Sequence, residues 1–217
     1  MTTRRGQDGL LSADSVLQRA SERLAQHFTG MVNEETVERI VFESYAALAR
    51  TASVSVHLPS LAEKFARDRL TALAQSKGLI AKPVPEILYV CVQNSGRSQM
   101  AAALTRHLSG GRVHVRSAGS QPGEQILPEV AEVLAELGIP VDEEYPKPLT
   151  DDVVRAADAV VTMGCGDACP IYPGKRYLDW QLRDPADLDL DGVRAVREDI
   201  RARVEQLLEE LVPADVS

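Results

Sequence analysis

The sequence predicts an α/β fold, a small parallel four-stranded sheet with helices on both faces, preceded by an all-α three-helix domain. Three observations lead to this prediction. Residues 1–82 show only the helical periodicity of apolar residues, whereas short apolar runs alternate with amphipathic segments from residue 83 onward. Pro83 and Pro85 lie between the two patterns. We therefore expect an N-terminal three-helix domain at 1–82 and a second domain at 83–217.

The first domain contains three predicted amphipathic helices and no strand. Apolar residues recur at intervals of three and four after Ser12, after Asn33 and after Pro59. Their apolar faces are Leu17, Ala20, Leu24 and Phe28; Val37, Ile40, Val41, Tyr45 and Leu48; and Leu61, Phe65, Leu70 and Leu73. Three such helices form a small bundle, and the last of them ends before Gly78.

The second domain begins with a continuous apolar run at 87–92, which is typical of a strand buried on both faces. The elements expected after it are a helix from Ser98 to about 109, a strand at 112–116, a helix at 126–137 ending at Gly138, a short helix from Thr150, a strand at 159–163, a weaker strand at 176–178 and a long helix at 193–211. Strands that alternate with helices form parallel sheets through right-handed crossovers. Such sheets bind ligands at the carboxyl ends of their strands.

Composition and charge exclude several function classes. The chain of 217 residues is 44% hydrophobic and 26% charged, and no apolar run approaches the roughly 18 residues of a membrane span. The first ten residues lack the pattern of a secretory signal, so we expect a cytoplasmic protein with reduced thiols. Residues 83–217 hold 13 Lys and Arg against 23 Asp and Glu. We therefore expect no nucleic-acid or membrane partner, and an anionic substrate must be held by local donors.

The segment C-V-Q-N-S-G-R-S, from Cys91 to Ser98, joins the first strand to its helix and carries the strongest functional pattern. Backbone N–H groups at a helix N-terminus, together with the helix dipole, bind a tetrahedral oxyanion. Asn94 and Gly96 tolerate the left-handed backbone of such a turn, and the planar fork of Arg97 can hold two anion oxygens. The residues predicted to bind the anion are Val92, Gln93, Asn94, Ser95, Gly96, Arg97 and Ser98.

The same loop predicts a nucleophile. The positive field of the loop should favour a Cys91 thiolate, and Ser98 could donate a hydrogen bond to its sulfur. The alternative, a buried strand cysteine beside a surface arginine, is the more common reading of a lone cysteine. The complete spacing of cysteine, five residues, arginine and serine between a strand and a helix favours the functional reading.

The run from Cys91 to Ala101 resembles the anion loop of arsenate reductases built on the low-molecular-weight tyrosine phosphatase fold, and the resemblance covers about residues 85–212. Its other landmarks are Ser117-Ala118-Gly119, the cysteines Cys165 and Cys169, and Asp184-Pro185. The resemblance implies that Asp184 is the general acid and that Asn94 and Ser117 give structural support. Trp180 could desolvate Asp184 and so favour its protonated form.

The two later cysteines follow the strand at 159–163, and in a helical segment thiols four residues apart are close enough for a disulfide. A structural cysteine pair or half of a zinc site are the alternatives, but none of the four histidines has ligand-like spacing. The resemblance implies a redox-active relay in which oxidation passes from Cys91 to Cys165 and then to Cys169. Thioredoxin would reset it.

The expected function is thus arsenate reduction by a thiol-dependent oxidoreductase for arsenic detoxification. Rival readings are a reductase that uses mainly Cys91 with mycothiol, or with glutathione and a glutaredoxin-like partner; a low-molecular-weight protein tyrosine phosphatase; and a non-enzymatic arsenite-binding protein. We expect no bound cofactor and no metal. Potassium is not predicted, because Ala102 stands where some reductases of the family have a glutamate that helps to hold this ion. The N-terminal helices are expected to be a stabilising appendage that could form a homodimer.

Overall fold

The computed structural model describes residues 13–52, 57–141, 144–164 and 169–212. The chain divides into two compact units, residues 1–70 and 71–217, and each is described by itself. Helix α3 (Leu58–Ser76) continues across this division. The domain boundary near residue 82 therefore stays a prediction. No helix among the described residues is long and apolar enough to cross a bilayer.

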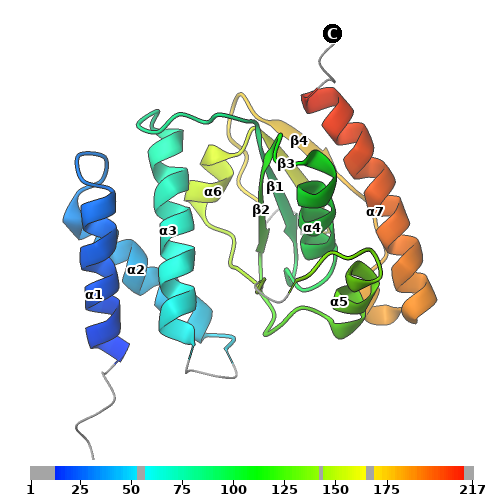
Figure 1. Ribbon diagram of the computed structural model, residues 1–217, viewed down its shortest axis with the longest axis horizontal. Helices are drawn as coiled ribbons and strands as arrows, with labels where there is room; N and C mark the ends of the chain where they lie inside the picture. The colour runs from blue at the N-terminus through cyan, green and yellow to red at the C-terminus, as the bar shows by residue number, and fades with distance from the viewer. Residues whose placement is uncertain (1–12, 53–56, 142–143, 165–168, 213–217) are drawn as a thin grey trace, which may run out of the picture. The chain divides into compact units, whose positions relative to one another are not determined.

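The first unit consists of α1 (Ala13–His27), α2 (Glu34–Ala49) and the first part of α3 (Figure 1), as the apolar periodicity predicts. Asn33 is the N-cap of α2, where its side chain accepts the Thr36 N–H at 2.9 Å. The core of the unit is formed by Leu17, Leu24, Phe28, Ile40, Val41 and Phe65, all nearly inaccessible to solvent. These residues are members of the predicted apolar faces, so the three-helix prediction is confirmed.

The second unit contains a sheet of four parallel strands in the order β2-β1-β3-β4. The strands are β1 (Glu86–Cys91), β2 (His114–Gly119), β3 (Ala159–Met163) and β4 (Arg176–Asp179). All six residues of β1 are buried because β1 pairs on both sides and is covered on both faces. Strand β2 begins two residues later than predicted, since the Arg112 N–H still bonds to the Ser109 carbonyl at the helix end.

Helices cover both faces of this sheet (Figure 1). On one face α4 (Arg97–Ser109), α5 (Pro128–Ala135) and α7 (Leu190–Leu211) pack over alternate residues of β1, among them Ile87, Tyr89 and Cys91. On the other face α6 (Asp151–Ala156) packs over Leu88 and Val90. A 3-10 turn, η2 (Pro185–Asp187), precedes α7. The register pairs Cys91 with Met163, so the segments that follow β1 and β3 leave the sheet side by side.

A buried ion cluster lies at the opposite end of the sheet. The Glu86 carboxylate, whose side chain is 1% exposed, accepts the Arg116 Nε–H at 2.7 Å and lies 3.1 Å from His114 Nδ1. Burial alone would raise the pKa of Glu86, but the hydrogen bond with His114 and the charge of Arg116 outweigh it and lower the pKa. Glu86 therefore stabilises the fold in its ionised form.

Replacement of Glu86 by glutamine is expected to lower the free energy of unfolding at pH 7 by about 3 kcal/mol, because Arg116 stays buried without its counter-ion. Because the folded-state pKa is below the unfolded value of 4.5, the contribution of Glu86 is complete above about pH 4.5 and is lost as the pH falls further. Urea unfolding of parent and Glu86→Gln should thus converge in acid. The exposed Glu124→Gln variant is the control. If the parent and Glu86→Gln differed in free energy of unfolding by the same amount at all pH values, this account would be contradicted.

Candidate active site

The loop from Cys91 to Ser98 is held from outside by the segment that follows β2. Backbone N–H groups of Ser120, Gln121, Gly123 and Leu127 donate to the carbonyl oxygens of Cys91, Val92, Gln93 and Ser95 at 2.8–3.1 Å. These bonds turn the loop carbonyls away from the loop centre. The N–H groups of Gln93, Ser95 and Gly96 make no backbone hydrogen bond within the described chain. The loop therefore has the donors that the predicted oxyanion site requires.

The turn of the loop depends on Asn94, which has a φ of +51° and is fully buried. Asparagine tolerates this left-handed conformation, so the prediction for Asn94 is confirmed. The same prediction for Gly96 is wrong, because its φ is −128°. A Cβ at Gly96 would instead lie 3.3 Å from Pro185 Cγ and 3.4 Å from Leu127 Cδ1. Gly96 therefore fits both a crowded position and a backbone with a φ of −128° and a ψ of −97°, which lies outside the main regions that residues with a side chain adopt.

The Ser117-Ala118-Gly119 landmark forms the end of β2, behind the loop. A Cβ at Gly119 would lie 2.7 Å from the Val92 carbonyl oxygen and 2.9 Å from the Asn94 nitrogen, so only glycine allows the loop to pack here. Ser117 is buried, and its Oγ has no hydrogen-bond partner among the described residues. Its role as structural support stays a prediction.

The sulfur of Cys91 lies at the base of the loop and is 2% exposed. The Asn94 N–H donates to it at 3.1 Å, and Ser98 Oγ lies 2.9 Å from it. Ser98 is itself buried and lies 2.7 Å from Asn94 Nδ2. The structure thus brings Cys91, Asn94 and Ser98 together, as the loop pattern predicts.

Arg97 and Asp184 meet at the mouth of the loop. Arg97 Nη2 lies 2.5 Å from Asp184 Oδ2, and Nη1 lies 3.5 Å from the Leu182 carbonyl oxygen. Asp184 also caps η2 by accepting the Ala186 N–H at 3.2 Å. A Cβ at Gly164 would lie 3.1 Å from Arg97 Nη1, so the glycine that follows β3 leaves room for the guanidinium. The Asp-Pro loop and the anion loop are therefore in direct contact.

Trp180 packs on Tyr89, with ring centroids 5.7 Å apart, and Arg203 lies over its ring. These described contacts do not include Asp184. The desolvation of Asp184 by Trp180 therefore stays a prediction. Burial of Tyr89 raises the pKa of its phenol, and its hydroxyl bonds to Thr105 Oγ1 at 2.8 Å.

Two of the three cysteines, Cys91 and Cys169, lie among the described residues, and they pack on opposite faces of the sheet. Cys165 lies outside the described residues. Cys169 is buried and packs with Val90 and Val160 on the α6 face of the sheet, whereas Cys91 packs on the α4 face. A cavity of about 620 Å³ is lined by Thr162, Cys169, Pro170, Ile171, Tyr177, Leu178 and Asp179. Transfer of oxidation from Cys91 to Cys169 thus needs an intermediate carrier or movement.

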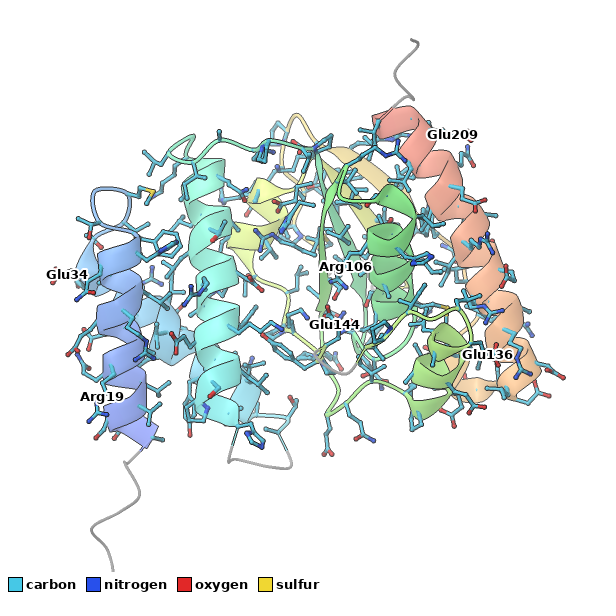
Figure 2. All side chains as sticks on the ribbon, viewed as in Figure 1. Arg19, Glu34, Arg106, Glu136, Glu144 and Glu209 are labelled. Atoms are coloured by element: carbon cyan, nitrogen blue, oxygen red, sulfur yellow. The ribbon has the colours of Figure 1, made fainter. Side chains whose placement is uncertain are left out.

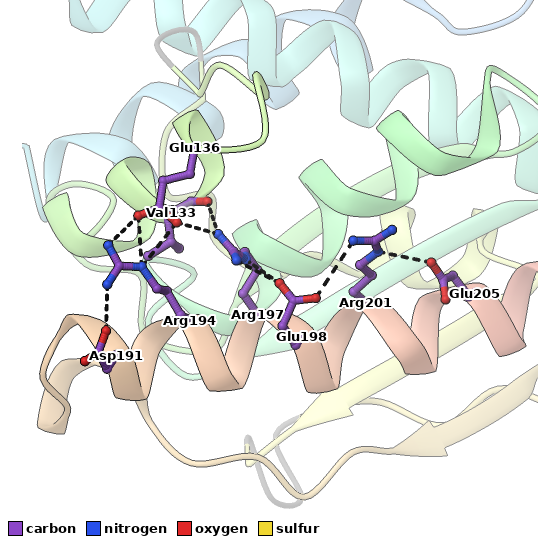
Figure 3. A network of polar contacts seen from close by, with 8 residues as sticks. All are labelled: Val133, Glu136, Asp191, Arg194, Arg197, Glu198, Arg201 and Glu205. Carbon is purple, nitrogen blue, oxygen red and sulfur yellow. Dashed lines mark hydrogen bonds and ion pairs between the residues drawn. The ribbon is translucent and has the colours of Figure 1, made fainter.

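A network of charged side chains joins α5, which begins next to the anion loop, to α7 (Figure 3). Glu136, at the C-cap of α5, bonds to Arg194 Nη2 at 2.6 Å and to Arg197 Nη1 at 2.8 Å, and Arg197 also donates to the Val133 carbonyl. The hydrogen bond from Arg194 is the main reason that the pKa of Glu136 is lowered. The network thus holds α5 against α7. The N–H of Leu127, the N-cap of α5, donates to the Ser95 carbonyl oxygen of the anion loop.

Sequence reasoning missed Gln99 and the segment around Lys147. Gln99 Nε2 lies 3.2 Å from Asn94 Oδ1 and 3.0 Å from the Tyr145 carbonyl oxygen, and the Lys147 N–H donates to Asn94 Oδ1 at 2.8 Å. Gln99 directly follows Ser98 and could have been suspected from its place in the loop motif. Tyr145 and Lys147 are about fifty residues away and carry no local signal.

The sequence and structure of the chain match those of known proteins. Residues 86–216 match the family described as low molecular weight phosphotyrosine protein phosphatase, and residues 17–74 match the protein-tyrosine-phosphatase-like N-terminal domain. The structure of a thioredoxin-dependent arsenate reductase from Corynebacterium glutamicum is 49% identical, with a TM-score of 0.81, and the match covers 90% of this chain and 96% of that one.

Two curated relatives match more than half of the chain. A putative arsenate reductase of Halobacterium salinarum is 35% identical over 132 residues, which is 58% of this chain and 93% of the relative. A glutaredoxin arsenate reductase of Synechocystis is 31% identical over 126 residues, which is 57% of this chain and 95% of the relative. The chain therefore belongs to the low molecular weight phosphotyrosine protein phosphatase family, among the members that resemble arsenate reductases and carry an additional N-terminal domain.

Proposed function

We propose that the protein is an arsenate reductase, a thiol-dependent oxidoreductase that converts arsenate to arsenite for arsenic detoxification. The observation that carries this proposal is the buried Cys91 sulfur, bonded by the Asn94 N–H beneath a loop whose free N–H groups suit a tetrahedral oxyanion. The arsenate reductases at 49% and 35% identity support the same reaction. The substrate is the arsenate oxyanion, held by the backbone of residues 92–98 and by Arg97.

The first step is attack of the Cys91 thiolate on arsenic. A sulfur–arsenic bond forms, one arsenic–oxygen bond breaks, and the leaving oxygen takes a proton from Asp184 and departs as water. Arg97 then has to exchange its bond with Asp184 for one with the anion, which frees Asp184 to act as the acid. Ser98 and Asn94 stabilise the thiolate through their hydrogen bonds.

The second step transfers two electrons to arsenic. The Cys165 thiolate attacks the Cys91 sulfur, a disulfide forms, and the electron pair of the sulfur–arsenic bond reduces arsenic(V) to arsenic(III), which leaves as arsenite. The Cys169 thiolate then attacks Cys165, so Cys91 is released and a Cys165–Cys169 disulfide remains. This order assigns Cys165 as the carrier between the two faces on which Cys91 and Cys169 are packed.

The external reductant is a thiol. Thioredoxin is favoured by the relative at 49% identity, whose name states thioredoxin dependence, and a glutaredoxin-linked system is the alternative named for the Synechocystis relative. Mycothiol is a further alternative that needs mainly Cys91. A tyrosine phosphatase activity would need only Cys91, Arg97 and Asp184, and hydrolysis of p-nitrophenyl phosphate in parallel with arsenate reduction separates the two functions.

The relay is tested by Cys169→Ser. Its first turnover with arsenate should proceed at the parent rate, while recycling by thioredoxin should fall to background because no Cys165–Cys169 disulfide can form. Rapid quench with detection of arsenite measures the first turnover, and NADPH oxidation coupled through thioredoxin reductase measures recycling. Unchanged multiple turnover with thioredoxin would rule out the relay and favour a reductant that acts on Cys91.

We also propose that residues 1–82 form a separate N-terminal domain that stabilises the protein or joins two copies. The match of residues 17–74 to a distinct N-terminal family supports a separate domain. Sedimentation of the full chain, which distinguishes a monomer of 23.6 kDa from a dimer, tests the second role.

A further inference from the structure

Gln99 is a buried side chain whose amide orientation is determined by its neighbours. It lies on α4, directly after Ser98, and is 1% exposed. Both of its partners, the Tyr145 carbonyl oxygen at 3.0 Å and Asn94 Oδ1 at 3.2 Å, are acceptors. Nε2 must therefore face them, and Oε1 has no hydrogen-bond partner among the described residues. An orphaned buried oxygen destabilises a fold, which suggests that Gln99 has another use.

Gln99 and the backbone of Lys147 together hold Asn94 in one orientation. Asn94 Oδ1 receives two hydrogen bonds, from Gln99 Nε2 and from the Lys147 N–H at 2.8 Å. With its oxygen turned to these donors, Asn94 must present Nδ2 to Ser98 Oγ, which lies 2.7 Å away. Ser98 Oγ accepts this bond, so its own proton is available for the Cys91 sulfur at 2.9 Å.

We propose that Gln99 is a positioning residue that directs the Ser98 proton to the Cys91 sulfur and so favours the thiolate. It acts through Asn94 and touches neither the sulfur nor the substrate. The proposal rests on the proposed function only in taking Cys91 as the nucleophile. With Asn94 turned the other way, Oδ1 would face Ser98 and accept the hydrogen bond of its hydroxyl. The Cys91 sulfur would then lose one of its two donors.

The outer end of this hydrogen-bond chain is anchored. Arg106 on α4 pairs with Glu144 at 2.9 Å (Figure 2), and Glu144 pairs with Lys147 Nζ at 3.1 Å. The Lys147 carbonyl also accepts the Gly119 N–H at 2.8 Å. The Tyr145 carbonyl and the Lys147 N–H are thus held by α4 and β2, and they form a fixed frame against which Gln99 and Asn94 are oriented.

The test is the pH profile of Cys91 alkylation by iodoacetamide, in a Cys165→Ser, Cys169→Ser background in which Cys91 is the remaining cysteine. Gln99→Glu places a carboxylate, which only accepts, against two acceptors, so it repels Asn94 Oδ1 and should displace the Asn94 amide from Ser98. Its profile should move to higher pH, with alkylation at pH 7 about tenfold slower, because a hydrogen bond to the charged sulfur is lost. Gln99→Met keeps the shape, removes one donor to Asn94 and should give a smaller shift in the same direction.

The exposed Gln125→Leu is the matched control and should leave the profile unchanged. In a Ser98→Ala background, Gln99→Met should cause no further shift, since the proton that Gln99 directs is gone. The proposal would be overturned if Gln99→Met had the pH profile of the parent. It would also be overturned if Gln99→Met shifted the profile in the Ser98→Ala background as much as it does with Ser98 present. Alkylation needs no arsenate, so a failure of the proposed function leaves this test intact.

Discussion

Cys91→Ser is expected to abolish arsenate reduction, with a loss of about 10³-fold or more in kcat. A serine hydroxyl is not ionised at neutral pH, and its oxygen cannot form the disulfide through which arsenic is reduced. The side chain lies 2% exposed within hydrogen-bond distance of Asn94 and Ser98, and serine is small enough to occupy the same space. NADPH oxidation with arsenate, thioredoxin and thioredoxin reductase measures the effect.

The control for Cys91→Ser is anion binding. Phosphate should still bind to the variant, measured by calorimetry, because the loop N–H groups and Arg97 are unchanged. Retention of more than a tenth of the parent rate with any thiol reductant would contradict the assignment of Cys91 as nucleophile. Loss of phosphate binding together with activity would mean that the loop had collapsed, and Cys91→Ala then provides the second variant.

Arg97→Lys is expected to lower kcat/KM for arsenate by about 100-fold. The guanidinium has several donors in one plane, and one of its nitrogens already bonds to Asp184 at 2.5 Å while the other faces the Leu182 carbonyl. A lysine ammonium is a point donor and cannot hold two anion oxygens in the same geometry. Because lysine retains the positive charge, the expected fall in kcat/KM measures the contribution of the guanidinium geometry and not that of net charge.

Arg39→Lys, an exposed arginine on α2 paired with Glu43, is the matched control and should leave kcat/KM unchanged. The first-turnover rate at saturating arsenate separates binding from chemistry, since loss of ground-state binding alone raises KM without changing kcat. A kcat/KM within threefold of the parent would show that the backbone N–H groups hold the anion without the fork of Arg97.

The order of apolar and polar residues along the chain was enough to predict the helices and strands and the anion loop. The apolar run that forms β1 and the helical spacing of α1, α2 and α7 are signals carried by neighbouring residues, and burial follows directly from them. The turn at Asn94 and its meeting with Cys91 and Ser98 span eight residues between a strand and a helix. Such short-range geometry is determined by backbone sterics and hydrogen bonding close in sequence.

The sequence by itself thus determined the α/β class and a nucleophile in an anion loop, because periodicity and loop spacing are local properties. Only the tertiary structure decided which distant groups complete that loop. Arg97 meets Asp184 87 residues away, and Gln99 bonds to Tyr145 46 residues away. The side chains that crowd Gly96 belong to Leu127 and Pro185, and Cys169 packs on the face of the sheet opposite to Cys91. These contacts exist only once the parallel crossovers have brought separate strand ends together.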